Sequence, residues 1–243
     1  MKMKTTKNNA PDTSRIVEQR DKVAFDFDVK EFPWTDKQKE FIKIAMDKNT
    51  RVVICRAPAG VGKTVLSLFC SLLKLKQKKV SEIVYIRAPI ESASKSVGFL
   101  AGSYEDKMSP YGLPLDDHLK ELLLPSIHQK LLKDQRIKVD SVGFIKGRTY
   151  NVASIIADEA EDLDPSETSL LLTRLGHYST LFLIGDSNQT NVKNSGFNKV
   201  FDLFNDDISK QNGVFTFEFD SSDCMRSPIT KFILQKFEEL NKK

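Results

Sequence analysis

Short apolar runs alternate along the chain with segments whose apolar residues recur at helical spacing. Six runs rich in β-branched and aromatic residues predict strands over 51–57, 82–88, 137–142, 151–158, 180–186 and 213–220. Several are almost continuously apolar, which is typical of strands buried on both faces of a parallel sheet. The segment 64–79 between the first two carries leucines at helical spacing. This alternation predicts an α/β fold, with a mostly parallel central sheet between helices on both faces.

Two other stretches carry strong local signals. Asp164 can cap a helix, Pro165 suits its first position and Glu167 completes the capping pattern, so a helix is expected there and Gly176 is expected to end it. The stretch 98–114 contains several glycines and prolines and predicts a long irregular connection.

Length and composition favour a single large domain. The 243 residues are enough for a substantial core, and no linker or internal repeat divides them. We expect residues 1–14 to form a disordered basic tail, 15–33 an N-terminal extension and 34–243 a single domain. The 37 basic and 33 acidic side chains leave a net charge of +4, which is too small to argue for nucleic-acid binding by itself.

Cysteine usage and hydropathy exclude several classes of protein. Cys55, Cys70 and Cys224 are too few and too far apart for a disulfide framework or a zinc site, and the first two are expected to be core thiols. No apolar run reaches the roughly 18 residues of a membrane span. We therefore expect no membrane partner and a cytoplasmic location, in the cytoplasm of a host cell if the protein is viral.

The stretch APAGVGKT, residues 57–64, has the pattern of a phosphate-binding loop between a strand and a helix. Gly60 and Gly62 permit a tight turn whose backbone N–H groups surround a phosphate. Lys63 would reach the β- and γ-phosphates of ATP, and the Thr64 hydroxyl would bind Mg²⁺. The residues expected to hold the nucleotide are Ala57, Pro58, Ala59, Gly60, Val61, Gly62, Lys63, Thr64 and Val65.

The loop departs from the usual pattern at its first position. Ala57 stands where G-x-x-x-x-G-K-[ST] has a glycine. Alanine is the smallest replacement, and Pro58 beside it stiffens the turn.

Two later strands end in residues suited to act on a bound triphosphate. Asp158 is expected to hold Mg²⁺ through its water shell, and Glu159 to orient or deprotonate the attacking water. The alternative is an acidic loop, because more acids follow. Gln189 comes shortly after the fifth predicted strand and could hydrogen-bond the γ-phosphate or the water, although a plain polar turn would look similar.

Taken in order, APAGVGKT, GFLAG, KGRT, DEAE, LTRLG and GDSNQ resemble the PhoH-like ATPases, which are related to superfamily-1 helicases. The resemblance runs from about Trp34 to the C-terminus. It implies a three-layer RecA-like P-loop NTPase that uses ATP and Mg²⁺, associates with single-stranded RNA or DNA and forms a homo-oligomer such as a hexameric ring. The chain departs from the family at Ala57, at Glu161, where Gln is common, and at Ala101, where Pro is usual.

The resemblance also suggests roles for individual side chains. It implies that Gln38 reads the adenine edge, while Thr35 and Gln38 also fit a capping box. An arginine finger would stabilise charge on the γ-phosphate. The candidates are Arg87, Arg148, Arg174 and Arg226. Arg226 is favoured because it follows the last strand, where helicase-like ATPases place such an arginine, and Arg174, which could contact an adjacent subunit, is second. Either could instead be a solvated surface charge.

Contacts to nucleic acid are expected from basic residues near strand ends and in irregular segments. Arg87, Lys95, Lys146 and Arg148 could meet phosphates, and Phe99 could stack on a base. The same residues could be ordinary surface charges and a loop anchor.

Two functions from different classes remain open at this stage. The chain could be an ATP hydrolase that remodels or moves along single-stranded RNA or DNA. We would then expect a second RecA-like domain to be supplied by another subunit, because 243 residues leave no room for one. Alternatively, it could be a nucleotide-gated assembly or interaction module with slow hydrolysis and no motor activity. A small-molecule kinase fits less well, because no arginine-rich lid is evident.

Overall fold

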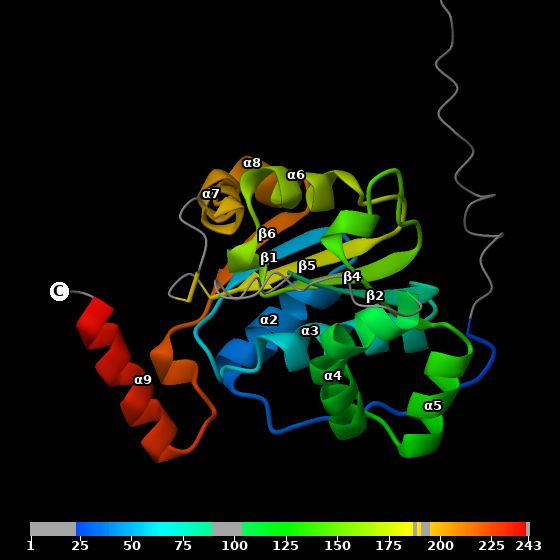
Figure 1. Ribbon diagram of the computed structural model, residues 1–243, viewed down its shortest axis with the longest axis horizontal. Coiled ribbons are helices and arrows are strands. Elements are labelled where there is room, and N and C mark those ends of the chain that lie inside the picture. The colour runs from blue at the N-terminus through cyan, green and yellow to red at the C-terminus, as the bar shows by residue number, and fades with distance from the viewer. Residues whose placement is uncertain (1–22, 89–103, 187–188, 191–194, 242–243) are drawn as a thin grey trace, which may run out of the picture.

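A six-stranded sheet forms the centre of the molecule (Figure 1). The computed structural model describes residues 23–88, 104–186, 189–190 and 195–241. The strands are β1 (Val52–Arg56), β2 (Glu82–Arg87), β3 (Ile137–Asp140), β4 (Ala153–Asp158), β5 (Thr180–Gly185) and β6 (Val214–Glu218). They lie in the order β3-β2-β4-β5-β1-β6, and all five pairings are parallel. All six predicted strands are therefore confirmed, with ends that are shorter by one or two residues.

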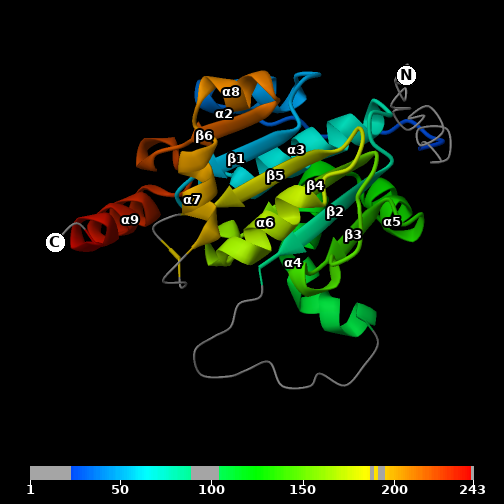
Figure 2. The ribbon, with the colours of Figure 1, turned by 90° about the horizontal axis from the view of Figure 1, so that it is seen from above.

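Helices cover both faces of the sheet, as predicted (Figures 1 and 2). One face carries α2 (Asp36–Met46), α3 (Lys63–Lys76), α4 (Tyr104–Leu122) and α5 (Pro125–Lys133). The other carries α6 (Pro165–Thr173) and α7 (Gly196–Leu203), with α8 (Asp207–Gln211) beside β6. Three single-turn helices, η1 (Val142–Phe144), η2 (Ala160–Asp162) and η3 (Ser221–Asp223), lie in loops, and α9 (Pro228–Asn241) extends away from the body (Figure 1).

The core consists of two hydrophobic layers, one on each face of the sheet. Side chains alternate along each strand, so Val53 and Cys55 of β1 face α3 while Val52 and Ile54 face the α6–α7 layer. Cys55 and Cys70 are fully buried, and burial raises the pKa of each thiol to about 12. Their predicted role as core thiols is confirmed.

Helix α4 corrects one expectation. The irregular connection predicted over 98–114 is wrong from Tyr104 onward, because α4 begins there and continues through Pro110 and Pro114. Proline removes a helical hydrogen bond, but burial of an apolar stripe in the second half of the helix offsets that loss. The buried leucines of this stripe are Leu115, Leu119 and Leu122. Residues 98–103 lie outside the described residues.

Gly176 has a different role from the one predicted. Helix α6 already ends at Thr173, and the next residue is its C-cap. A Cβ on Gly176 would collide with the Asn151 side chain and the Tyr150 carbonyl. The glycine therefore permits the chain after α6 to approach the segment that leads into β4.

The described part of the N-terminal extension belongs to the core. Val23 and Phe27 are buried in the layer beneath α3, and the Lys30 N–H donates to the Leu122 carbonyl at 2.8 Å. The predicted tail over 1–14 lies outside the described residues.

Candidate nucleotide-binding site

The candidate site lies at the carboxyl edge of β1, β5 and β4. The phosphate loop follows β1, Asp186 follows β5 and Asp158 ends β4. Strand β5 lies between the other two, so Asp158 is not on a strand adjacent to β1. Parallel strands bring their carboxyl ends to the same edge, which places all three segments together.

Residues 60–64 form a turn of backbone N–H groups at the start of α3. Gly60 has φ +86° and Gly62 has φ +84°, and Gly62 is the N-cap of α3. Among the described residues, the N–H groups of residues 60–64 have no acceptor. They lie at the positive end of the helix dipole, an arrangement that suits a phosphate.

Ala57 fits the first position of the loop without strain. It is buried, its φ is not in the positive region, and its N–H donates to the Gly185 carbonyl at 2.9 Å. A glycine is needed where φ is positive or where a Cβ would clash, and neither condition applies here. The missing glycine therefore leaves the conformation of the loop intact.

The Asp158 carboxylate joins three elements. It is 4% exposed, and its Oδ2 accepts hydrogen bonds from the Thr64 hydroxyl at 3.0 Å and the Tyr85 hydroxyl at 2.8 Å. Its Oδ1 accepts from the Glu159 N–H at 3.0 Å. A hydroxyl and a carboxylate at hydrogen-bonding distance beside a phosphate loop are the hard oxygen donors that Mg²⁺ prefers, so the residues present fit that ion.

Glu159 adopts a left-handed backbone conformation, with φ 55° and ψ 39°. This conformation is uncommon for a residue with a side chain and often marks a functional position. One carboxylate oxygen of Glu159 lies 3.3 Å from the Arg87 guanidinium at the end of β2. Arg87, which we considered for phosphate contacts, therefore pairs with the candidate catalytic carboxylate.

Asp186 links the third strand to the phosphate loop. Its buried Oδ2 accepts from the Ala59 N–H at 3.0 Å and from the Gln189 side-chain amide at 2.8 Å. This shared oxygen brings Gln189 to the same edge as the loop, although Gln189 itself is exposed. The polar turn predicted there is thus also part of the site.

Glu161 is the least expected group in the site. It is 1% exposed, and its Oε2 has no hydrogen-bond partner among the described residues. Burial, together with the nearby Glu159 charge, raises the pKa of Glu161 to about 8. The site therefore favours the neutral form of the carboxyl group, which has the charge of the Gln that the resemblance leads one to expect.

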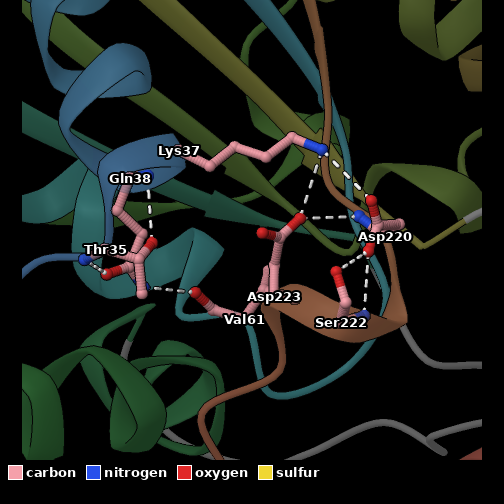
Figure 3. A network of polar contacts seen from close by, with 7 residues as sticks. All are labelled: Thr35, Lys37, Gln38, Val61, Asp220, Ser222 and Asp223. Carbon is pink, nitrogen blue, oxygen red and sulfur yellow. Dashed lines mark hydrogen bonds and ion pairs between the residues drawn. The ribbon is translucent and has the colours of Figure 1, made fainter.

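Gln38 is anchored at both ends of its amide (Figure 3). Its Oε1 accepts from the Thr35 N–H at 2.9 Å, and the Thr35 hydroxyl accepts from the Gln38 N–H at 3.2 Å, so the capping box is confirmed. The Gln38 Nε2 donates to the Val61 carbonyl at 3.0 Å. Gln38 therefore supports the phosphate loop from α2, and adenine recognition remains a prediction.

A segment after β6 also docks on the loop. Lys37, beside Gln38 in α2, forms ion pairs with Asp220 at 3.3 Å and Asp223 at 3.2 Å (Figure 3). Shortly afterwards the Met225 N–H donates to the Gly60 carbonyl at 2.9 Å. A Cβ on Gly60 would lie 2.7 Å from the Arg226 side chain, so Arg226 passes directly over the loop.

Arg174 lies at the opposite edge of the sheet. It caps the C-terminus of α6, and its carbonyl accepts from the Tyr150 N–H at 3.0 Å, close to the start of β4. The structure therefore does not bring Arg174 to the phosphate loop of its own chain.

The other basic candidates are not gathered at the loop. Arg148 forms an ion pair with Asp140 at 2.6 Å beside the edge strand β3, and Lys146 is exposed nearby. Lys95 and Phe99 lie outside the described residues. Among the described residues, no group of His, Cys, Asp and Glu side chains could hold a metal by itself.

The sequence did not reveal three supporting residues. Tyr85 appears only as part of an apolar strand, Lys37 as one of many helix-surface lysines, and Asp186 as the acid beside Gln189. Their partners are far away along the chain, and no local pattern marks such contacts. A polar side chain facing inward from a central strand, as Tyr85 does, was the one available signal.

We expect Tyr85→Phe to weaken the support of Asp158. The change keeps the packed ring but removes a hydrogen bond to a buried carboxylate, so the free energy of unfolding should fall by about 1.5–3 kcal/mol in urea denaturation. Tyr178→Phe, at a position 47% exposed, is the control and should change little. A loss below about 0.5 kcal/mol for Tyr85→Phe would show that this hydrogen bond does not hold Asp158.

We expect Glu161→Gln to stabilise the protein in a pH-dependent way. Because the pKa of Glu161 is raised on folding, the wild type loses stability as the pH rises from about 4.5 to 8. The variant lacks this loss and should exceed the wild type by about 4 kcal/mol at pH 8 but not at pH 4.5. Urea denaturation without Mg²⁺ or nucleotide measures the difference. The exposed change Glu121→Gln serves as the control, and a difference that does not vary with pH would refute the expectation.

The described part of the chain contains no helix long and apolar enough to cross a membrane.

A solved structure with a similar fold is the large terminase of a thermophilic bacteriophage. It matches with a TM-score of 0.50 and 14% identity, over 84% of this chain and 50% of that one. At this identity the match supports the fold, which is that of a RecA-like P-loop NTPase.

Sequence relatives are more specific. A PhoH-like protein of Bacillus subtilis is 30% identical over 204 residues, covering 84% of this chain and 63% of the relative. A PhoH-like protein of Mycobacterium leprae is 33% identical over 210 residues, covering 85% and 58%. The chain thus spans about three-fifths of the length of these curated relatives. The family model described as PhoH-like protein matches residues 32–238, and the chain therefore belongs to the PhoH-like family.

Proposed function

We propose that the chain binds and hydrolyses ATP with Mg²⁺ and couples turnover to single-stranded RNA or DNA within a homo-oligomeric ring. The observation that carries the proposal is the meeting of three strand ends at one edge. There the free N–H groups of the phosphate loop lie beside the Thr64–Asp158 pair and the Asp186–Gln189 pair. This is the set of groups that phosphoryl transfer to water requires.

Each side chain has a defined task in this proposal. The loop N–H groups and Lys63 bind the phosphates, and Thr64 and Asp158 would hold Mg²⁺, which neutralises phosphate charge when bound. Glu159 accepts a proton from the attacking water, and its pairing with Arg87 orients the carboxylate.

Two further side chains complete the proposed site. Gln189, held by Asp186, orients the attacking water or detects the γ-phosphate. Arg226 is well placed to act as the finger, because the segment that carries it is fastened to both Gly60 and α2.

The ring and the nucleic-acid partner rest on less direct support. Helix α9 presents Ile229, Phe232 and Ile233 to solvent at exposures of 64%, 55% and 45%, which suits contact with another copy. Arg174, being remote from its own phosphate loop, would serve only in a neighbouring subunit. For nucleic acid, the family resemblance is the main support, together with the exposed Lys146.

Phosphate release from Mg²⁺–ATP tests the proposal. We expect turnover by the wild type, stimulation by single-stranded RNA or DNA, and a loss of at least about 100-fold in Lys63→Ala and Glu159→Gln. Lys76→Ala is the matched control, because Lys76 lies at the far end of α3, where it pairs with Asp28. It should keep wild-type turnover.

The outcomes separate the two candidate functions. Turnover that equals background in the wild type while ATP still binds would refute hydrolysis and favour the nucleotide-gated assembly module. Turnover that ignores nucleic acid would refute the coupling. Sedimentation with and without nucleotide tests the ring, which fails if the chain remains monomeric under both conditions.

A further inference from the structure

A pocket of about 310 Å³ lies at the amino edge of the sheet, opposite the phosphate loop. Helices α2 and α3 end there, and the chain enters β1 and β5 beside it. Lys74 of α3 lines this pocket roughly 16 Å along the helix axis from Lys63, at about 1.5 Å per residue. The volume falls at the lower end of the roughly 300–1,000 Å³ that is usual for ligand sites.

Lys74 is a buried cation that forms no ion pair with any described residue. Its side chain is 5% exposed, and its Nζ donates to the Thr180 hydroxyl at 3.2 Å. The ammonium group has three donors, and the described residues provide an acceptor for one of them. Burial lowers the pKa of Lys74 to about 8. A buried charge is retained at a cost in stability, which an anion in the pocket would offset.

The other charges around the pocket are mostly positive. Lys48, Arg51 and Lys79 line it together with Lys74, and Asp47 is the acid among the lining residues. Among the described residues, Lys48 and Lys79 form no ion pair and are exposed. The Arg51 Nη2 donates to the Gly176 carbonyl at 3.0 Å, which uses one of five guanidinium donors.

Asp47 does not neutralise this cluster. Its Oδ1 accepts a hydrogen bond from the Asn49 N–H at 2.8 Å in the turn after α2. Within the described part of the chain, the pocket is lined by this one carboxylate and by four cationic side chains. Like charges held together around a partly enclosed space are a favourable environment for an oxyanion, because lysine and arginine donors then converge on one ligand.

We infer that this pocket binds a phosphate group, in a site separate from the phosphate loop. The inference does not rest on ATP hydrolysis. The group could belong to a free anion such as pyrophosphate or to a phosphodiester backbone. A second hollow of about 720 Å³ shares Asp47, Lys48 and Arg51 and adds Lys210, so a ligand with several phosphates could continue into it.

Calorimetric titration of the full chain with sodium pyrophosphate, against sodium chloride of equal ionic strength, tests the inference. We expect binding to persist in Lys63→Ala, which alters only the phosphate loop. It should weaken at least about 10-fold in Lys74→Met and about 3-fold in the exposed Lys79→Gln. Lys76→Met is the matched control, because Lys76 lies in the same turn of α3 and pairs with Asp28 outside the pocket.

Thermal unfolding guards against a folding defect. Without anion, Lys74→Met should melt no lower than the wild type, because it removes a buried charge. Pyrophosphate should raise the melting temperature of the wild type but not of the variant. If the melting temperature of Lys74→Met is lower than that of the wild type, pyrophosphate binding by Lys79→Gln decides whether the pocket is the site.

Three results would overturn the inference: no binding, binding lost in Lys63→Ala but kept in Lys74→Met, or equal losses in Lys74→Met and Lys76→Met. A parallel titration with a short single-stranded oligonucleotide distinguishes the sources. If Lys74→Met weakens pyrophosphate and oligonucleotide binding alike, the site takes a backbone phosphate; if it weakens pyrophosphate alone, the site takes a free anion.

Discussion

The buried carboxylate of Asp158 is the contact on which the arrangement of the site depends. It receives the hydroxyl of Thr64 from α3 and the hydroxyl of Tyr85 from β2, and it lies at the end of β4. A charged group at 4% exposure is stable only where donors surround it, so these three elements are held in fixed positions by the same requirement. The donors that stabilise the fold are thus also those that would position a metal ion.

A second set of contacts fixes the loop from the outside. Gln38 and Lys37 are neighbours on α2, yet one binds the loop and the other binds the segment after β6 (Figure 3). The same segment returns to Gly60 through Met225. A displacement of the loop would therefore break contacts both with α2 and with the segment after β6. Helix α9 comes directly after this segment in the chain.

Much of this arrangement could be predicted from the sequence, because parallel strands end where loops carry chemistry. The strands, the phosphate loop, and the positions of Asp158 and Glu159 all follow from local patterns of apolar and polar residues. The order of the strands does not follow from such local patterns. The position of β5 between β1 and β4 could therefore not be predicted. Long-range partners such as Tyr85 were missed for the same reason. Helix α4 was missed because its two prolines are strong local signals against a helix, whereas the burial that stabilises it depends on tertiary packing.

The two edges of the sheet bury groups of opposite charge type, carboxyl groups at the carboxyl edge and a lysine at the amino edge. At the carboxyl edge, Asp158 is surrounded by donors, Glu159 is paired with Arg87, and burial favours the neutral form of Glu161. At the amino edge, Lys74 is buried and forms no ion pair with a carboxylate among the described residues. If a fold only had to be stable, a buried lysine would be replaced readily by an apolar residue of similar shape. Both edges contain groups whose arrangement is best explained by a ligand, with phosphate as the chemistry they share. Helix α3 thus begins at the proposed nucleotide site and ends at the proposed second phosphate site.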